Sequence, residues 1–115
     1  MNKVLPLLVA SLLLCSCNAV IKPNLTLTQF ETGEVITGNF NIVSHWVEVT
    51  MPDGEVLQGH ASVMFENEET AAWHAYALLK SSKSNLMLEL SVKGSGYSGF
   101  GDAQTNNGKK YRVQL

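Results

Sequence analysis

The fold is decided by residues 43–65, which have the sequence VSHWVEVTMPDGEVLQGHASVMF. Pro52-Asp53-Gly54 at the centre is typical of a tight turn, because proline presets φ, aspartate suits the next position and glycine tolerates a positive φ. Apolar and polar residues alternate on both sides of this turn, as expected for strands with one buried face. The segment therefore predicts a β-hairpin with a three-residue loop.

Met51 and Glu55 close this loop, and the facing pairs of the two strands then follow from the register. One face of the hairpin is apolar, and we expect it to be buried. Its residues are Val47, Val49, Leu57, Gly59, Ala61, Val63 and Phe65. Trp46 lies on the opposite, polar face, directly across from His60.

Similar alternation outside this hairpin predicts further strands. A first strand is expected to begin near Leu25, and a strong strand pattern covers Asn85–Val92. Asn106-Asn107-Gly108 predicts the tip of a last hairpin between Phe100–Thr105 and Lys109–Leu115. Strands and turns at intervals of roughly 8 to 12 residues indicate an all-β domain, an antiparallel meander that forms a small sandwich or barrel.

Two further segments have less regular patterns of secondary structure. Residues 67–80, NEETAAWHAYALLK, combine good helix formers with strand-like alternation from Trp73 to Leu79. We favour a strand there and keep one short helix as the alternative. Residues 94–101, GSGYSGFG, are expected to form a flexible glycine turn.

A weak internal repeat supports a meander of hairpins. Gly33–Gly38 recurs 21 residues later as Gly54–Gly59, and residues 108–113 keep the leading glycine. Each copy predicts a turn glycine that starts a strand, and the second glycine of the first two copies indicates a bulge or a close backbone approach. The pattern remotely resembles repeats of the MORN type, in which glycine-started β-hairpins stack.

Composition excludes several classes of function. The 115 residues carry 8 basic and 10 acidic side chains, so we expect no nucleic-acid surface.

Glu66, Glu68 and Glu69 predict a solvated turn rather than opposed catalytic carboxylates, and no nucleophile motif occurs. The histidines have no metal-like spacing to other ligand residues. They are His45, His60 and His74. We therefore expect no enzyme activity, no metal site and no cofactor.

The first 17 residues have the anatomy of an export signal. Lys3 gives a positive start, and Val4–Leu14 is an apolar stretch too short to span a bilayer. This segment supplies 12 of the apolar residues of the chain. Without it, the composition is that of an ordinary soluble domain.

Leu14-Cys15-Ser16-Cys17 resembles the lipobox of bacterial lipoproteins, with leucine at −3, serine at −1 and the modified cysteine at +1. The competing frame ends at Cys15 and places leucine at −1, where signal peptidase favours a small residue, so Cys15 is the fallback. The resemblance implies that Cys17 receives a diacylglycerol, becomes the first mature residue and is acylated further, as with palmitate. Two or three such chains anchor a protein firmly to a membrane.

The same resemblance implies the location and division of the chain. Asn18, next to the modified cysteine, implies the outer membrane in enteric-type bacteria. The expected divisions are a signal peptide at 1–16, a lipidated linker at 17–24 and a single β domain at 25–115.

Two exposed aromatic positions are candidates for partner binding, Trp46 with His60 across from it and Tyr97 in the glycine turn. The leading hypothesis is a non-enzymatic lipoprotein, on the periplasmic or surface face of the outer membrane, that binds a protein of an envelope assembly, secretion or pilus system. One alternative is a blocking protein, an inhibitor or a phage or conjugation exclusion factor, that inserts the loop at 94–101. Another is a glycan- or peptidoglycan-binding module that uses Trp46 and Tyr97.

Overall fold

The computed structural model describes residues 23–115. The predicted export signal, Cys15 and Cys17 lie outside the described residues. Within residues 23–115 there is no helix long and apolar enough to cross a membrane.

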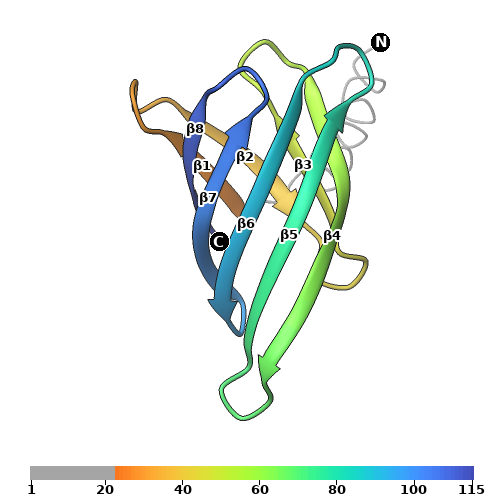
Figure 1. Ribbon diagram of the computed structural model, residues 1–115, viewed down its shortest axis with the longest axis vertical. Helices are drawn as coiled ribbons and strands as arrows, with labels where there is room; N and C mark the ends of the chain where they lie inside the picture. The colour runs from red at the N-terminus through yellow and green to blue at the C-terminus, as the bar shows by residue number, and fades with distance from the viewer. Residues whose placement is uncertain (1–22) are drawn as a thin grey trace, which may run out of the picture.

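Eight strands form a closed antiparallel barrel in which each strand pairs with the next and β1 pairs with β8 (Figure 1). The strands are β1 (Leu25–Gln29), β2 (Val35–Phe40), β3 (Trp46–Thr50), β4 (Val56–Asn67), β5 (Ala72–Ser81), β6 (Met87–Ser95), β7 (Ser98–Thr105) and β8 (Lys110–Gln114). The predicted all-β meander is confirmed, and its form is a barrel rather than a sandwich. The predicted start of the first strand at Leu25 is also confirmed.

The register of the central hairpin is the one that the turn residues predict. Val49 pairs with Leu57 and Trp46 pairs with His60 in the β3–β4 ladder. The Met51 amide donates to the Glu55 carbonyl at 2.8 Å and closes the loop. Turn chemistry and period-two alternation were therefore sufficient to place every facing pair of this ladder.

The barrel interior is the hydrophobic core. Inward-facing side chains of all eight strands fill it, and each fully buried leucine or valine contributes about 1.5–3 kcal/mol relative to an exposed one. The most deeply buried are Leu25, Leu27, Val47, Val49, Leu57, Ala77, Leu79, Leu88, Leu90, Val92, Tyr111 and Val113.

Residues 67–80 form a turn and most of strand β5, so the helix alternative is wrong. Alternate residues of β5, Trp73, Ala75, Ala77 and Leu79, are buried in the barrel. Neighbouring strands β4 and β6 pair with β5 on both sides. This sheet environment overrides the helix propensity of the alanines and leucines.

The glycine-rich segment at 94–101 is mostly strand, and its prediction as a flexible turn is wrong. Only Gly96 and Tyr97 form the turn between β6 and β7. Gly94 and Gly99 sit within the β6–β7 ladder, where a Cβ atom would lie 2.6 and 3.0 Å from atoms of the Trp73 ring. These two glycines make space for the indole rather than flexibility for the backbone.

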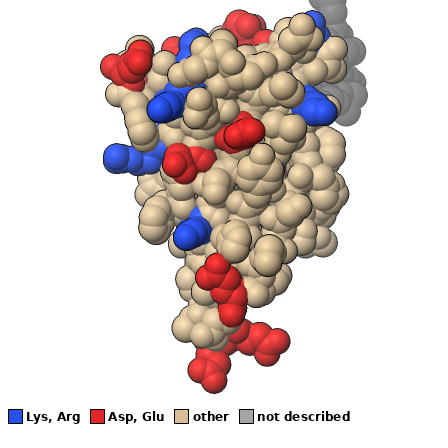
Figure 2. Space-filling model, in the orientation of Figure 1, with Lys and Arg blue, Asp and Glu red and all other residues tan. Residues whose placement is uncertain are grey.

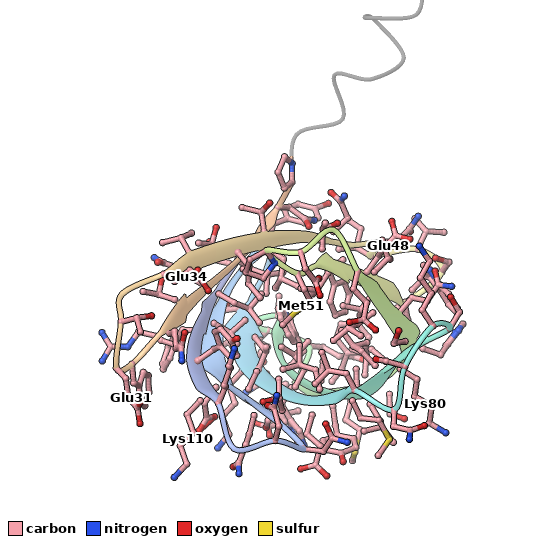
Figure 3. All side chains as sticks on the ribbon, turned by 90° about the horizontal axis from the view of Figure 1, so that it is seen from above. Glu31, Glu34, Glu48, Met51, Lys80 and Lys110 are labelled. Atoms are coloured by element: carbon pink, nitrogen blue, oxygen red, sulfur yellow. The ribbon has the colours of Figure 1, made fainter. Side chains whose placement is uncertain are left out.

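The barrel has two different ends. The Met51 end comprises the turns at 30–34, 51–55, 82–86 and 106–109. The Met51 side chain is buried there and lies over the middle of the barrel, as the view along the barrel shows (Figure 3). The leading glycines of the sequence repeat, Gly33, Gly54 and Gly108, all occupy turns of this end with positive φ.

The opposite end, here called the Asn24 end, comprises the connections at 41–45, 68–71 and 96–97 together with the start of β1. Asn24 fastens the entering chain to the end of β2. Its Nδ2 donates to the Phe40 carbonyl at 2.8 Å, and its Oδ1 accepts from the Phe40 amide at 2.7 Å. The segment that leads to the predicted lipid site therefore joins the barrel at this end.

Candidate functional site

An open pocket of about 200 Å³ lies at the Asn24 end of the barrel. Its walls are mostly apolar, and the pocket reaches the buried ring of Trp73. The side chains that define it include Phe40, Val63, Phe65, Trp73, Tyr97 and Leu115. The pocket thus exposes hydrocarbon surface where the barrel core meets solvent.

Trp73 forms the floor of this pocket and is held from two sides. Its Nε1 donates a hydrogen bond of 2.8 Å to the Gly96 carbonyl in the β6–β7 turn. Its ring also packs against Phe40, with ring centroids 6.4 Å apart. These contacts hold the indole between β2 and the β6–β7 turn.

One wall of the pocket extends past the rest of the barrel. Strand β4 pairs with β3 only as far as His60, whereas its pairing with β5 continues to Asn67. The β4–β5 hairpin consequently projects beyond the neighbouring connections (Figure 1). A register shift between Phe65 and Asn67 ends the regular ladder.

Phe65 lies on the inner face of this projecting hairpin, as its alternation with Ala61 and Val63 predicts. It is nevertheless 71% exposed, so its predicted burial is wrong. Within residues 23–115, the neighbouring strand β3 does not extend alongside this part of the hairpin. An inward-facing phenylalanine is therefore left uncovered at the rim of an apolar pocket.

The backbone of β4 also has a free edge at residues 62–65. The Ala61 amide donates 2.8 Å to the His45 carbonyl, so the Ala61 backbone groups point away from β5. Val63 and Phe65, two and four residues further on, direct their backbone groups to the same side because strand residues alternate. Among the described residues, no strand pairs with this side of β4 beyond His60.

Three glutamates lie at the end of the β4–β5 hairpin. Glu66 Oε1 lies 2.7 Å from His74 Nδ1, while Glu68 and Glu69 are exposed in the connecting loop. Neither lysine nor arginine occurs in the described connections of the Asn24 end. On the face in view, Figure 2 shows acidic atoms and no basic atoms at the lower tip of the molecule.

The sequence-predicted candidates fall at two places. Trp46 and His60 meet on the outer wall of β3 and β4, with ring centroids 6.0 Å apart and planes at 72°. Trp46 is 41% exposed there. Tyr97, in contrast, is 81% exposed and lines the pocket. The structure therefore brings Trp46 and His60 together and connects Tyr97 with Phe65 and Trp73, two site residues that the sequence did not single out.

Few features of the described residues point to metal binding or to a perturbed ionisable group. They contain no group of three or more histidine, cysteine, aspartate or glutamate side chains that could hold a metal. One resolved pKa shift concerns Tyr111, whose pKa is raised by burial and further by the Glu34 carboxylate. Tyr111 lies in the barrel core, so this shift bears on stability rather than on the pocket.

Comparison with models of known protein families finds no match for this chain. Comparisons with curated proteins and with solved structures likewise find no similar protein.

Proposed function

We propose that this protein is a lipid-anchored component of the bacterial cell envelope that binds another protein through the Asn24 end of its barrel. The anchor part of the proposal rests on Leu14-Cys15-Ser16-Cys17 and the export signal before it. The binding part rests on the apolar pocket. We expect binding rather than catalysis, because the pocket offers mostly hydrocarbon side chains.

The binding proposal rests mainly on one observation. Phe65 is exposed to solvent although its side chain lies on the inner face of the hairpin. Large aromatic side chains that fill pockets dominate the energetics of protein interfaces. Phe65 and Tyr97 both border the pocket and are largely exposed. A partner that covers them would bury apolar surface worth about 25 cal/mol per Å².

The linker limits where the partner can be. Six residues lie between Cys17 and Asn24, and the seven steps from one Cα to the next span at most about 25 Å of extended chain. A lipid on Cys17 would keep the Asn24 end within that distance of the membrane. The expected partner is therefore a protein at the membrane surface or within the membrane.

Photocrosslinking in intact cells tests the binding proposal. A photoreactive phenylalanine analogue replaces either Phe65 or Phe100, which is 73% exposed on the outer side of β7 and serves as the matched control. We expect position 65 to give a discrete protein adduct, identified by mass spectrometry, and position 100 to give none. Adducts of glycan or lipid alone at position 65 would refute a protein partner.

Acylation is tested separately with two serine variants. We expect Cys17→Ser to abolish uptake of labelled palmitate and release the protein from membranes, whereas Cys15→Ser should retain both. Continued labelling of Cys17→Ser together with loss in Cys15→Ser would move the anchor to Cys15. Labelling of both variants would exclude a single lipobox cysteine.

A further inference from the structure

We propose, building on the function above, that the partner supplies an extended segment that adds as a strand to the free edge of β4. This segment places one apolar side chain, flanked by lysine or arginine, in the pocket at the Asn24 end. Three independent features specify this occupant: the free strand edge, the size of the pocket and the charge beside it.

The free edge specifies an extended polypeptide. Val63 and Phe65 direct backbone N–H and C=O groups away from β5, where the described residues offer no strand partner. Such groups are a template for strand addition, in which main-chain hydrogen bonds give affinity and alternate side chains give specificity. The bulge after Phe65 limits this edge to a short segment and opposes uncontrolled edge-to-edge association.

The pocket specifies a single inserted side chain. Its volume of about 200 Å³ is below the roughly 300–1,000 Å³ of typical small-molecule sites. Because Phe65 points to the inner face, every second residue of a strand on the β4 edge would point to the same face and toward the pocket. The inserted side chain would then lie against Phe65 and above Trp73.

The charge specifies basic residues beside that side chain. Glu68 and Glu69 occupy the loop that follows β4, shortly after Phe65 in the chain, while Glu66 contacts His74 on the outer wall. The nearest cation on the neighbouring strands is Lys93, which pairs with His74 on the outer wall. Acidic side chains at the tip also disfavour insertion into an anionic lipid surface, so a basic protein segment is the better fit.

A random displayed peptide library, selected against the purified full chain, tests the proposal. We expect the enriched peptides to share an aromatic or large aliphatic residue within a few positions of lysine or arginine. Phe65→Ser should weaken their binding about tenfold or more, whereas Phe100→Ser should leave it unchanged. Glu68→Gln combined with Glu69→Gln should weaken binding about threefold and reduce its salt dependence.

Backbone methylation of one selected peptide tests the strand geometry without altering the protein. Only alternate amides of an added strand face β4. We therefore expect N-methylation at alternate positions to weaken binding about tenfold or more, while methylation of the intervening amides has little effect. Equal sensitivity at all positions, or at none, would overturn strand addition.

The remaining outcomes separate this inference from the proposed function. Peptides that need Phe65 but lack basic residues would refute the charge requirement and leave protein binding intact. If peptides are enriched only after residues 18–22 are replaced by Gly and Ser, the result would show that the chain's own Val20-Ile21-Lys22 segment occupies the site. No enrichment, with Phe65-dependent binding to anionic vesicles instead, would refute both proposals.

Discussion

Phe65 and Trp73 face each other across the β4–β5 ladder, yet Trp73 is 8% exposed and Phe65 is 71% exposed. Both side chains are on the inner face of the hairpin. Trp73 is covered by Phe40 and by the β6–β7 turn, whereas Phe65 lies on the part of β4 that extends past its pairing with β3. The boundary between the buried core and the exposed surface therefore runs between two paired residues.

This asymmetry predicts opposite effects on stability. Phe65→Ser should change the free energy of unfolding by less than about 0.5 kcal/mol, as for other exposed positions. Trp73→Ala should lower it by about 3–5 kcal/mol, because it removes a large buried ring. Urea unfolding of the full chain measures both. A large loss for Phe65→Ser would show that Phe65 belongs to the core.

Gly94 and Gly99 should differ in their tolerance of a methyl group. A Cβ atom on Gly94 would meet the Trp73 ring at 2.6 Å and the Ser98 carbonyl oxygen closer still, whereas the nearest contacts at Gly99 are about 3.0 Å. We expect Gly94→Ala to cost more than about 3 kcal/mol and Gly99→Ala about 1–3 kcal/mol. Thermal unfolding of the two variants measures these losses of stability. Equal losses would contradict the prediction.

The raised pKa of Tyr111 predicts a loss of stability in alkaline solution. Above about pH 10 the unfolded chain releases the phenol proton, while burial and then Glu34 keep it bound in the folded state. The stabilising contribution is complete below the ordinary pKa of 10.0 and is lost as the pH rises through the folded value. Because Tyr111→Phe cannot ionise, its free energy of unfolding should fall less between about pH 9 and 11.

Urea unfolding at a series of pH values measures this difference. Tyr76→Phe is the control, because it removes a phenol that is 49% exposed instead of one in the core. Parallel alkaline curves for wild type and Tyr111→Phe would mean that Tyr111 does not contribute.

Asn24 should stabilise the end of the barrel where the linker enters. Asn24→Ala removes both hydrogen bonds to the Phe40 backbone and should cost about 1–3 kcal/mol. Asn24→Asp keeps the acceptor oxygen but places a carboxylate oxygen against the Phe40 carbonyl oxygen, so it should not restore the lost stability. Amide hydrogen exchange of Phe40 would be accelerated most in Asn24→Ala, and unchanged exchange would exclude this role.

Local patterns in the sequence were sufficient for most of the fold. Pro52-Asp53-Gly54 and the alternation around it determine the β3–β4 register, including the contact of Trp46 with His60. Asn106-Asn107-Gly108 placed the β7–β8 turn for the same reason. Residues 67–80 were ambiguous, because helix propensity is local while the pairing of β5 on both sides is not.

The pocket could not be predicted, because it depends on where neighbouring strands end. Alternation predicts that Phe65 lies on the inner face, but its burial also depends on how far the surrounding strands extend, and the pairing of β4 with its neighbour β3 ends at His60. The sequence predicts Tyr97 as an exposed aromatic, but its position at the pocket depends on the β6–β7 turn lying against Trp73, whose Nε1 donates to the Gly96 carbonyl. The glycine-rich pattern at 94–101 does not reveal the role of Gly94 and Gly99, because the Trp73 ring that they accommodate lies about twenty residues earlier in the chain.

Radical footprinting of the wild-type chain tests most directly whether the Asn24 end is a binding surface. Side-chain labelling is compared between intact cells and the purified chain at Phe65, Tyr97 and Phe100, all strongly exposed in the structure. We expect Phe65 and Tyr97 to be protected in cells and Phe100 to be labelled equally in both conditions. Equal labelling of Phe65 in cells and in isolation would contradict the proposal that a partner covers this end of the barrel.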